Sequence, residues 1–161
     1  MKQENTTLEI ERRFLVRDEF PKDDASSVNI VQGYICRDKN HTVRVRIAGN
    51  EAYLTIKGCN RNDGFSHLEI EKLISQEEAH QLLDICEPGI IRKRRYYVPC
   101  NDTKHVFEVD VYEGQNKGLI IAEIELSSEN DVFDYPTWLG EEITHDYKYS
   151  NSILSQKEYK K

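Results

Sequence analysis

The chain of 161 residues is about the size of one domain, and its composition excludes several classes of protein. Hydrophobic residues make up 38% of it, which is enough for a core and predicts a single globular domain over residues 1–161. Acids outnumber bases by 29 to 22, for a net charge of −7. Proteins that coat nucleic acids or bind membrane surfaces usually need a basic excess, so neither partner is expected.

No apolar targeting segment follows Met1, and no apolar run approaches the length of a membrane span. These features predict a cytoplasmic protein without a membrane partner. The four cysteines lack C-x-x-C spacing, which favours free thiols over a zinc or redox pair.

Period-two alternation between turn-forming residues predicts eight strands. In chain order they span residues 8–16, 30–37, 42–48, 51–58, 66–73, 90–99, 105–112 and 119–127. Short loops between them predict antiparallel pairing, with a meander as the simplest topology.

One helix interrupts the strands. Ser75 and Glu78 form a capping-box pattern, and Pro88-Gly89 ends the helical spacing of apolar residues that follows it. This amphipathic helix is expected to cover the sheet. Shorter helical pieces are predicted around residues 130–135 and 149–157.

Like charges recur at every second position of the predicted strands. In the opening stretch LEIERRFLV, Glu9, Glu11 and Arg13 share one face, about 6.5–7 Å apart along the strand. Further same-face pairs are Arg44 with Arg46, Glu69 with Glu71, Lys93 with Arg95, Glu108 with Asp110, and Glu123 with Glu125. Apart from the strand at residues 90–99, the opposite face of these strands is largely apolar.

Two interpretations of these charged faces remain open from the residues alone. In the first, the charges point outward, pair across strands and keep the sheet soluble. In the second, they line the interior of a closed barrel and need counter-ions there. Carboxylates at this spacing suit Mg²⁺ or Mn²⁺, and clustered Arg and Lys side chains suit polyphosphate oxygens. The glycine-rich loops that usually bind nucleotide phosphates are absent from the sequence.

The stretch from Glu9 to Val16 resembles the ExExK signature of the CYTH superfamily, the triphosphate tunnel metalloenzymes. The likeness continues in order through residues 32–34, 43–46, 54–57, 68–71, 93–95, 107–112, 122–125, 138–144 and 146–149. It implies an α+β, mainly antiparallel fold, in which a closed eight-stranded barrel carries its charges inward and a few helices cover it. It also implies hydrolysis of inorganic triphosphate to diphosphate and phosphate with Mg²⁺ or Mn²⁺.

The resemblance implies a role for each acidic side chain. Glu9, Glu11 and Glu125 are expected to bind the catalytic metal, and Glu123 to be a ligand or to orient the attacking water. Glu69, Glu71 and Asp110 are second-tier candidates for another metal or for structural salt bridges.

The basic residues are implied to bind phosphate oxygens, with Lys148 at one end of the tunnel. They are Arg13, Arg44, Arg46, Lys57, Lys93, Arg95 and Lys148. For the general base we prefer Lys93 and retain Tyr34, because a tyrosine needs a larger pKa shift to act at neutral pH. Arg13 departs from the signature lysine, which bears on substrate preference.

Other assignments are compatible with the same residues. Within the family they include an adenylate cyclase and a thiamine or nucleoside triphosphatase, and outside enzymes a non-catalytic polyphosphate-binding module. The five histidines lack ligand spacing, Trp138 and Tyr112 are expected to pack, and Arg92 and Arg94 to face solvent. A homodimer that pairs the outer faces of the barrel is compatible with the sequence, but no sequence pattern marks an interface.

Overall fold

The computed structural model describes residues 10–38, 40–59 and 67–160. Its strands are β1 (Ile10–Val16), β2 (Ser26–Arg37), β3 (His41–Ala48), β4 (Glu51–Cys59), β5 (His67–Ile74), β6 (Ile91–Pro99), β7 (Val106–Tyr112), β8 (Ile120–Leu126) and β9 (Leu139–Glu142). Its helices are α1 (Gln76–Asp84) and α2 (Asn151–Leu154), with short 3₁₀ turns η1 (Gly114–Asn116) and η2 (Tyr147–Tyr149). In the part of the chain described, no helix is long and apolar enough to cross a membrane.

The chain separates into two compact units, each assembled from three segments. Unit 1 contains residues 1–26, 96–110 and 120–145, and unit 2 contains residues 27–95, 111–119 and 146–161. The hydrogen-bonded strand order is β5-β4-β3-β2-β6-β7-β8-β1-β9, and β6 and β7 each contribute residues to both units. The prediction of a mainly antiparallel β fold with helices is confirmed. The single domain and the closure of the barrel stay predictions.

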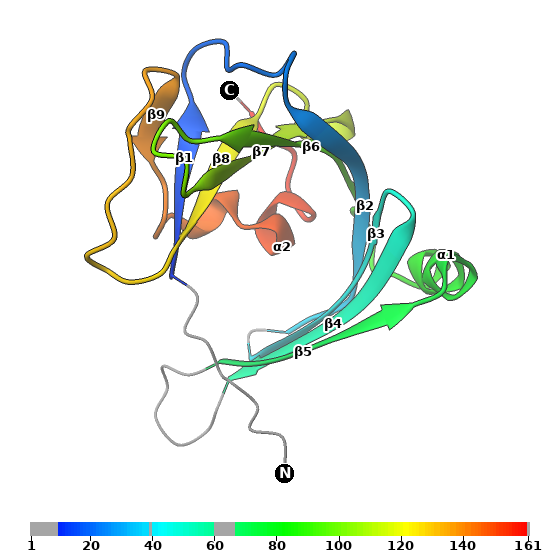
Figure 1. Ribbon diagram of the computed structural model, residues 1–161. Helices are drawn as coiled ribbons and strands as arrows, with labels where there is room; N and C mark the ends of the chain where they lie inside the picture. The colour runs from blue at the N-terminus through cyan, green and yellow to red at the C-terminus, as the bar shows by residue number, and fades with distance from the viewer. Residues whose placement is uncertain (1–9, 39, 60–66, 161) are drawn as a thin grey trace. The chain divides into compact units, whose positions relative to one another are not determined.

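In unit 2, strands β2 to β5 form a continuous antiparallel meander. Its apolar face packs against α1, as Figure 1 shows, through a core of Val45, Ala52 and Ala79. Gly33 lies on this same face, opposite Val45. A Cβ atom there would approach Cys86 Sγ to 2.8 Å, so the close fit requires glycine.

The predicted capping box of α1 is present. Ser75 Oγ accepts the Glu78 amide at 3.1 Å, and Glu78 Oε2 accepts the Ser75 amide at 2.8 Å. The helix therefore begins where the sequence predicts, and its position fixes which face of the meander is left for charged residues.

In unit 1, β1 lies between β8 and β9 and pairs antiparallel with both (Figure 1). Arg12 binds Glu142 of β9 through two hydrogen bonds of 2.9 and 2.6 Å, so this pair ties the strands together. Beside it, Phe14 packs edge-on against Phe133 and Tyr135, and Trp138 packs against Phe107. The expectation that Trp138 packs in the core is confirmed.

Three details of the predicted secondary structure were wrong. A ninth strand, β9, follows the eight expected. Strand β1 pairs with β8 and β9, whereas a simple meander pairs it with the next strand in the chain, β2. Residues 130–135 are not helical beyond a turn at their start. Pro136 disfavours helical geometry at the preceding residue, and Phe133 anchors the segment in the aromatic cluster.

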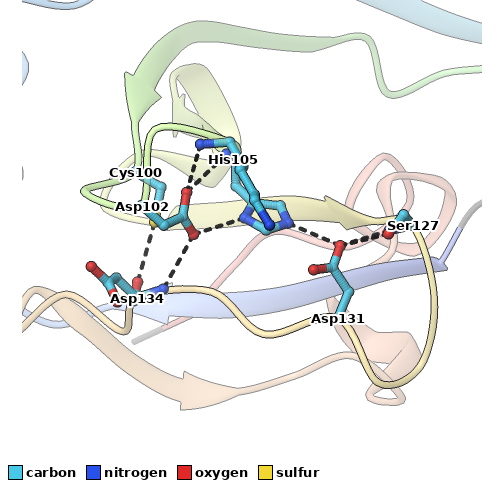
Figure 2. A network of polar contacts seen from close by, with 7 residues as sticks. Cys100, Asp102, His105, Ser127, Asp131 and Asp134 are labelled. Carbon is cyan, nitrogen blue, oxygen red and sulfur yellow. Dashed lines mark hydrogen bonds and ion pairs between the residues drawn. The ribbon is translucent and has the colours of Figure 1, made fainter.

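A buried histidine joins the β6–β7 loop to the segment after β8 within unit 1 (Figure 2). His105 Nδ1 lies 2.7 Å from Asp102 Oδ2, and His105 Nε2 lies 3.0 Å from Asp131 Oδ2. Ser127 donates to Asp131 through its amide and hydroxyl at 3.0 and 2.9 Å. With its side chain only 8% exposed, the imidazole is enclosed between two carboxylates.

These contacts favour a charged imidazolium. Hydrogen bonds to Asp131 and Asp102 raise the pKa of His105 above its ordinary 6.5. Hydrogen bonds from His105 and Ser127 lower the pKa of Asp131 to about 2. Burial would raise the pKa of Asp102, but bonds from the His105 amide and ring outweigh it and hold that pKa far below 3.8.

We expect this network to stabilise the fold most between about pH 4 and 6.5. The raised pKa of His105 gives stability that is complete below pH 6.5 and lost as the pH rises through the folded-state pKa. The lowered pKa values of the aspartates give stability that is present above pH 3.8 and lost toward acid. Urea unfolding of the wild type and His105→Gln at pH 3, 5.5 and 9 should show the largest difference at pH 5.5.

The exposed His80 on α1 supplies the matched control. The difference in unfolding free energy between the wild type and His80→Gln should stay small at every pH. A difference for His105→Gln that does not change with pH would contradict the charged network.

Candidate functional site

The polar face of the unit 2 meander points away from α1 and carries three of the seven expected phosphate-binding residues, Arg44, Arg46 and Lys57. Cross-strand register places Gln32 opposite Arg46, and Tyr34 opposite Arg44. Arg44 is in turn opposite Thr55, and Thr55 opposite Glu71. These side chains share one face of β2, β3, β4 and β5, and together with Lys57 and Glu69 we call them the polar array of unit 2. Its members are Gln32, Tyr34, Arg44, Arg46, Thr55, Lys57, Glu69 and Glu71.

The cations in this array are held by acceptors on the next strands. Arg44 Nη2 donates to Thr55 Oγ1 at 3.2 Å and lies 3.7 Å from Glu71 Oε2. Thr55 Oγ1 donates to Glu71 at 2.9 Å. Lys57 Nζ lies 3.3 Å from Glu69 Oε2. Of the two open roles for these glutamates, the described contacts favour structural salt bridges.

Tyr34 is buried beside the two arginines of the array. Burial raises its pKa above the ordinary 10, and the positive charges of Arg44 and Arg46 oppose that shift without cancelling it. The side chain therefore stays a neutral phenol at neutral pH. This disfavours Tyr34 as a proton acceptor.

Strand β6 presents its two charged pairs to opposite environments. Lys93 is 1% exposed and Arg95 is buried, whereas Arg92 and Arg94 are exposed, as their alternation predicts. Lys93 Nζ lies 5.4 Å from the centre of the Tyr112 ring, a cation–π distance. On this strand the charged Lys93–Arg95 face is therefore buried, and the Arg92–Arg94 face is exposed.

Asp110 and Lys148 differ sharply in their surroundings. Asp110 on β7 is fully buried. Lys148 is exposed, and its ammonium lies 3.1 Å from Asp146 Oδ2, a contact that raises the pKa of the lysine. In this structure Lys148 therefore pairs with Asp146, the residue that caps its own 3₁₀ turn η2.

The acidic residues of unit 1 meet across β1 and β8. Glu11 is opposite Glu125, and Arg13 is opposite Glu123. Arg13 Nε lies 3.1 Å from Glu123 Oε1 and 3.9 Å from Glu11 Oε1, so one guanidinium lies between two carboxylates.

The donor set in unit 1 fits a hard divalent cation in its chemistry. Like charges directly opposite each other are unfavourable in a sheet, and a bound cation would offset the repulsion between Glu11 and Glu125. Glu9, the third expected ligand, lies outside the described residues. Within the described ranges, no three His, Cys, Asp or Glu side chains form a group able to hold a metal.

The sequence patterns missed two polar residues of the array, Gln32 and Thr55. Both are almost completely buried, at 0% and 1% exposure. Neither carries charge, so the search for like-charge pairs passed over them. Their position on the same face as Arg44 and Arg46 was the available signal.

Comparison with known proteins identifies the fold and the family. The model of the CYTH domain matches residues 7–157. The chain belongs to the CYTH domain family.

Two curated relatives of this CYTH chain carry the name inorganic triphosphatase. One, from Acetivibrio thermocellus, is 44% identical over 153 residues, which is 94% of this chain and 96% of the relative. Another, from Nitrosomonas europaea, is 34% identical over 150 residues, 91% of this chain and 96% of the relative. The crystal structure of the inorganic triphosphatase NE1496 superimposes with a TM-score of 0.71 at 32% identity, covering 92% of this chain and 95% of that one.

We expect Arg13 and Glu123 of this CYTH chain to stabilise each other. Both are largely buried, at 13% and 12% side-chain exposure, so losing either partner should cost about 1–3 kcal/mol of unfolding free energy. Urea unfolding of Arg13→Leu, Glu123→Leu and the double variant should show a double variant that loses less than the sum of the single ones. The exposed Arg92→Leu should change stability by less than about 0.5 kcal/mol, and purely additive effects would contradict the pairing.

Proposed function

We propose that this protein hydrolyses inorganic triphosphate to diphosphate and phosphate, with Mg²⁺ or Mn²⁺ as cofactor. The observation that carries the proposal is the 44% identity, over nearly all of both chains, to a relative named inorganic triphosphatase. Two sets of polar residues support it. Strands β1 and β8 carry the carboxylates of Glu11, Glu123 and Glu125, and strand β3 carries the cations Arg44 and Arg46.

In this proposal Glu9, Glu11 and Glu125 hold the metal. The cation, when bound, neutralises charge on the phosphate chain and favours in-line displacement. Arg13 keeps the carboxylate of Glu123 in a fixed direction through their 3.1 Å contact. Glu123 is thereby proposed to orient the attacking water or to complete the ligand set.

The basic side chains of unit 2 are proposed to bind phosphate oxygens. Arg44, Arg46 and Arg95 offer forked N–H groups that match such oxygens, and Lys57 and Lys148 add point charges. Both lysines have carboxylate partners in this structure and would exchange them for substrate. Arg13 is proposed to contribute mainly through the carboxylates that it contacts.

The reaction breaks the bond between the terminal phosphorus and its bridging oxygen as a water oxygen bonds to that phosphorus. The water loses a proton, which a base must accept. We propose Lys93, which is buried against Tyr112, for this role. The raised pKa of Tyr34 argues against the alternative.

The cytoplasmic location and a homodimer remain proposals from the sequence. The proposed partner is a small triphosphate, without nucleic acid or membrane.

The purified protein should release phosphate from triphosphate only when Mg²⁺ or Mn²⁺ is present, and chelation should abolish the activity reversibly. Glu11→Gln and Glu125→Gln should each lower kcat by more than roughly 100-fold, because even outer partners of metal ligands cost about 10–100-fold when removed. Glu77→Gln, at an exposed glutamate of α1, is the matched control and should leave kcat unchanged. Malachite-green phosphate release measures each rate.

The alternative functions give different products in the same assay. Tight triphosphate binding without turnover would identify a binding module and overturn the proposal. Faster hydrolysis of ATP or thiamine triphosphate would reassign the substrate, and cyclic AMP from ATP would identify a cyclase.

The two bases can be separated by substitution. Lys93→Met should lower kcat by roughly 100-fold or more, as expected for removal of a general base. Tyr34→Phe should lower it less than roughly tenfold, since it removes one neutral hydroxyl. Lys72→Met, an exposed lysine on β5, serves as control. A larger loss in Tyr34→Phe than in Lys93→Met would reverse the assignment.

A further inference from the structure

Two hydrogen-bond donors in the unit 2 array are buried without a partner among the described residues. They are Gln32 Nε2 and Arg44 Nε. Buried polar groups in native proteins are almost always paired, so an unpaired donor of this kind requires an explanation. Both atoms are donors, and so the partner that would satisfy them must be an acceptor.

The orientation of the Gln32 amide follows from its neighbour. Arg46 Nε donates to Gln32 Oε1 at 3.0 Å, and a guanidinium has no acceptor. The amide oxygen therefore faces Arg46, and the NH₂ group with its two donors points elsewhere. Arg46 thereby fixes which atom of Gln32 is available to a ligand.

The surroundings of this amide select an anionic acceptor. Gln32 is opposite Arg46 and shares its face with Tyr34, which is opposite Arg44. Another cation among these arginines would add repulsion, whereas an amide supplies donors without charge. An oxygen of a phosphate chain is an acceptor that the neighbouring guanidinium charges also favour.

We propose that Gln32 is a substrate-binding residue, whose amide NH₂ donates to a phosphoryl oxygen of the triphosphate. The inference rests on the proposed function and deepens it. Arg46 acts on the same substrate as a cation and also as the group that orients the Gln32 amide.

The test is the steady-state hydrolysis of triphosphate by the full chain. Gln32→Met keeps the length of the side chain and removes its donors, so KM should rise roughly 10–100-fold while kcat changes little. The matched control is Gln76→Met, at an exposed glutamine whose amide donates to the Gly49 carbonyl at 3.3 Å. Its KM should equal that of the wild type.

A double-variant cycle separates binding of substrate from support of Arg46. If Gln32 donates directly, Gln32→Met should raise KM in the Arg46→Met background as well. If Gln32 only holds Arg46, the effect should vanish in that background, which would overturn the inference. Should Gln32→Met fail to fold, judged by circular dichroism, Gln32→Leu removes the same donors without adding charge and should also raise KM.

The outcomes distinguish this inference from the proposed function. If the unaltered protein does not hydrolyse triphosphate, both are overturned. If it does, and Gln32→Met retains the wild-type KM, the function stands and the role of Gln32 is refuted.

Discussion

The alternation of a β-strand is the constraint on which the rest of this protein depends. A strand that carries charge at every second residue must carry something else on its other face. In unit 2 that other face is apolar, and α1 covers it through Ala79 against Val45 and Ala52. The charged face then needs its own neutralisation, and cross-strand ion pairs such as Arg44 with Glu71 and Lys57 with Glu69 contribute to it.

Some polar atoms on the charged face of unit 2 lack a hydrogen-bond partner among the described residues. On the polar face of unit 2, the buried atoms that lack a partner among the described residues are donors, on Gln32 and Arg44. Lys93 is also buried, at 1% exposure, and its ammonium lies 5.4 Å from the centre of the Tyr112 ring. In unit 1, Glu11 lies opposite Glu125 and its carboxylate is 3.9 Å from the Arg13 guanidinium.

The sequence predicted the features that depend on residues close together in the chain, namely the strands and the start of α1. Alternation identified eight strands, Ser75 and Glu78 located the start of α1, and Arg92 and Arg94 were correctly expected to face solvent. The features that the sequence did not predict are a short strand and contacts between residues far apart in the chain. β9 has four residues, too few for a periodic signal, and His105 gains its partner Asp131 only through the fold. Gln32 carries no charge, so only the register with Arg46 reveals its orientation.

Arg13 shows how a departure from a family signature can be accommodated. Arg13 stands where the family signature that the sequence resembles has lysine, a difference that bears on substrate preference. In the structure its guanidinium lies between Glu123 and Glu11 of the same unit. A lysine would bring a single point charge to this place, whereas the planar guanidinium donates a hydrogen bond to Glu123 in a fixed direction and lies 3.9 Å from Glu11. Under the proposed function, any influence of Arg13 on specificity should act through the direction of these glutamates, because their oxygens would have to converge on the proposed cation.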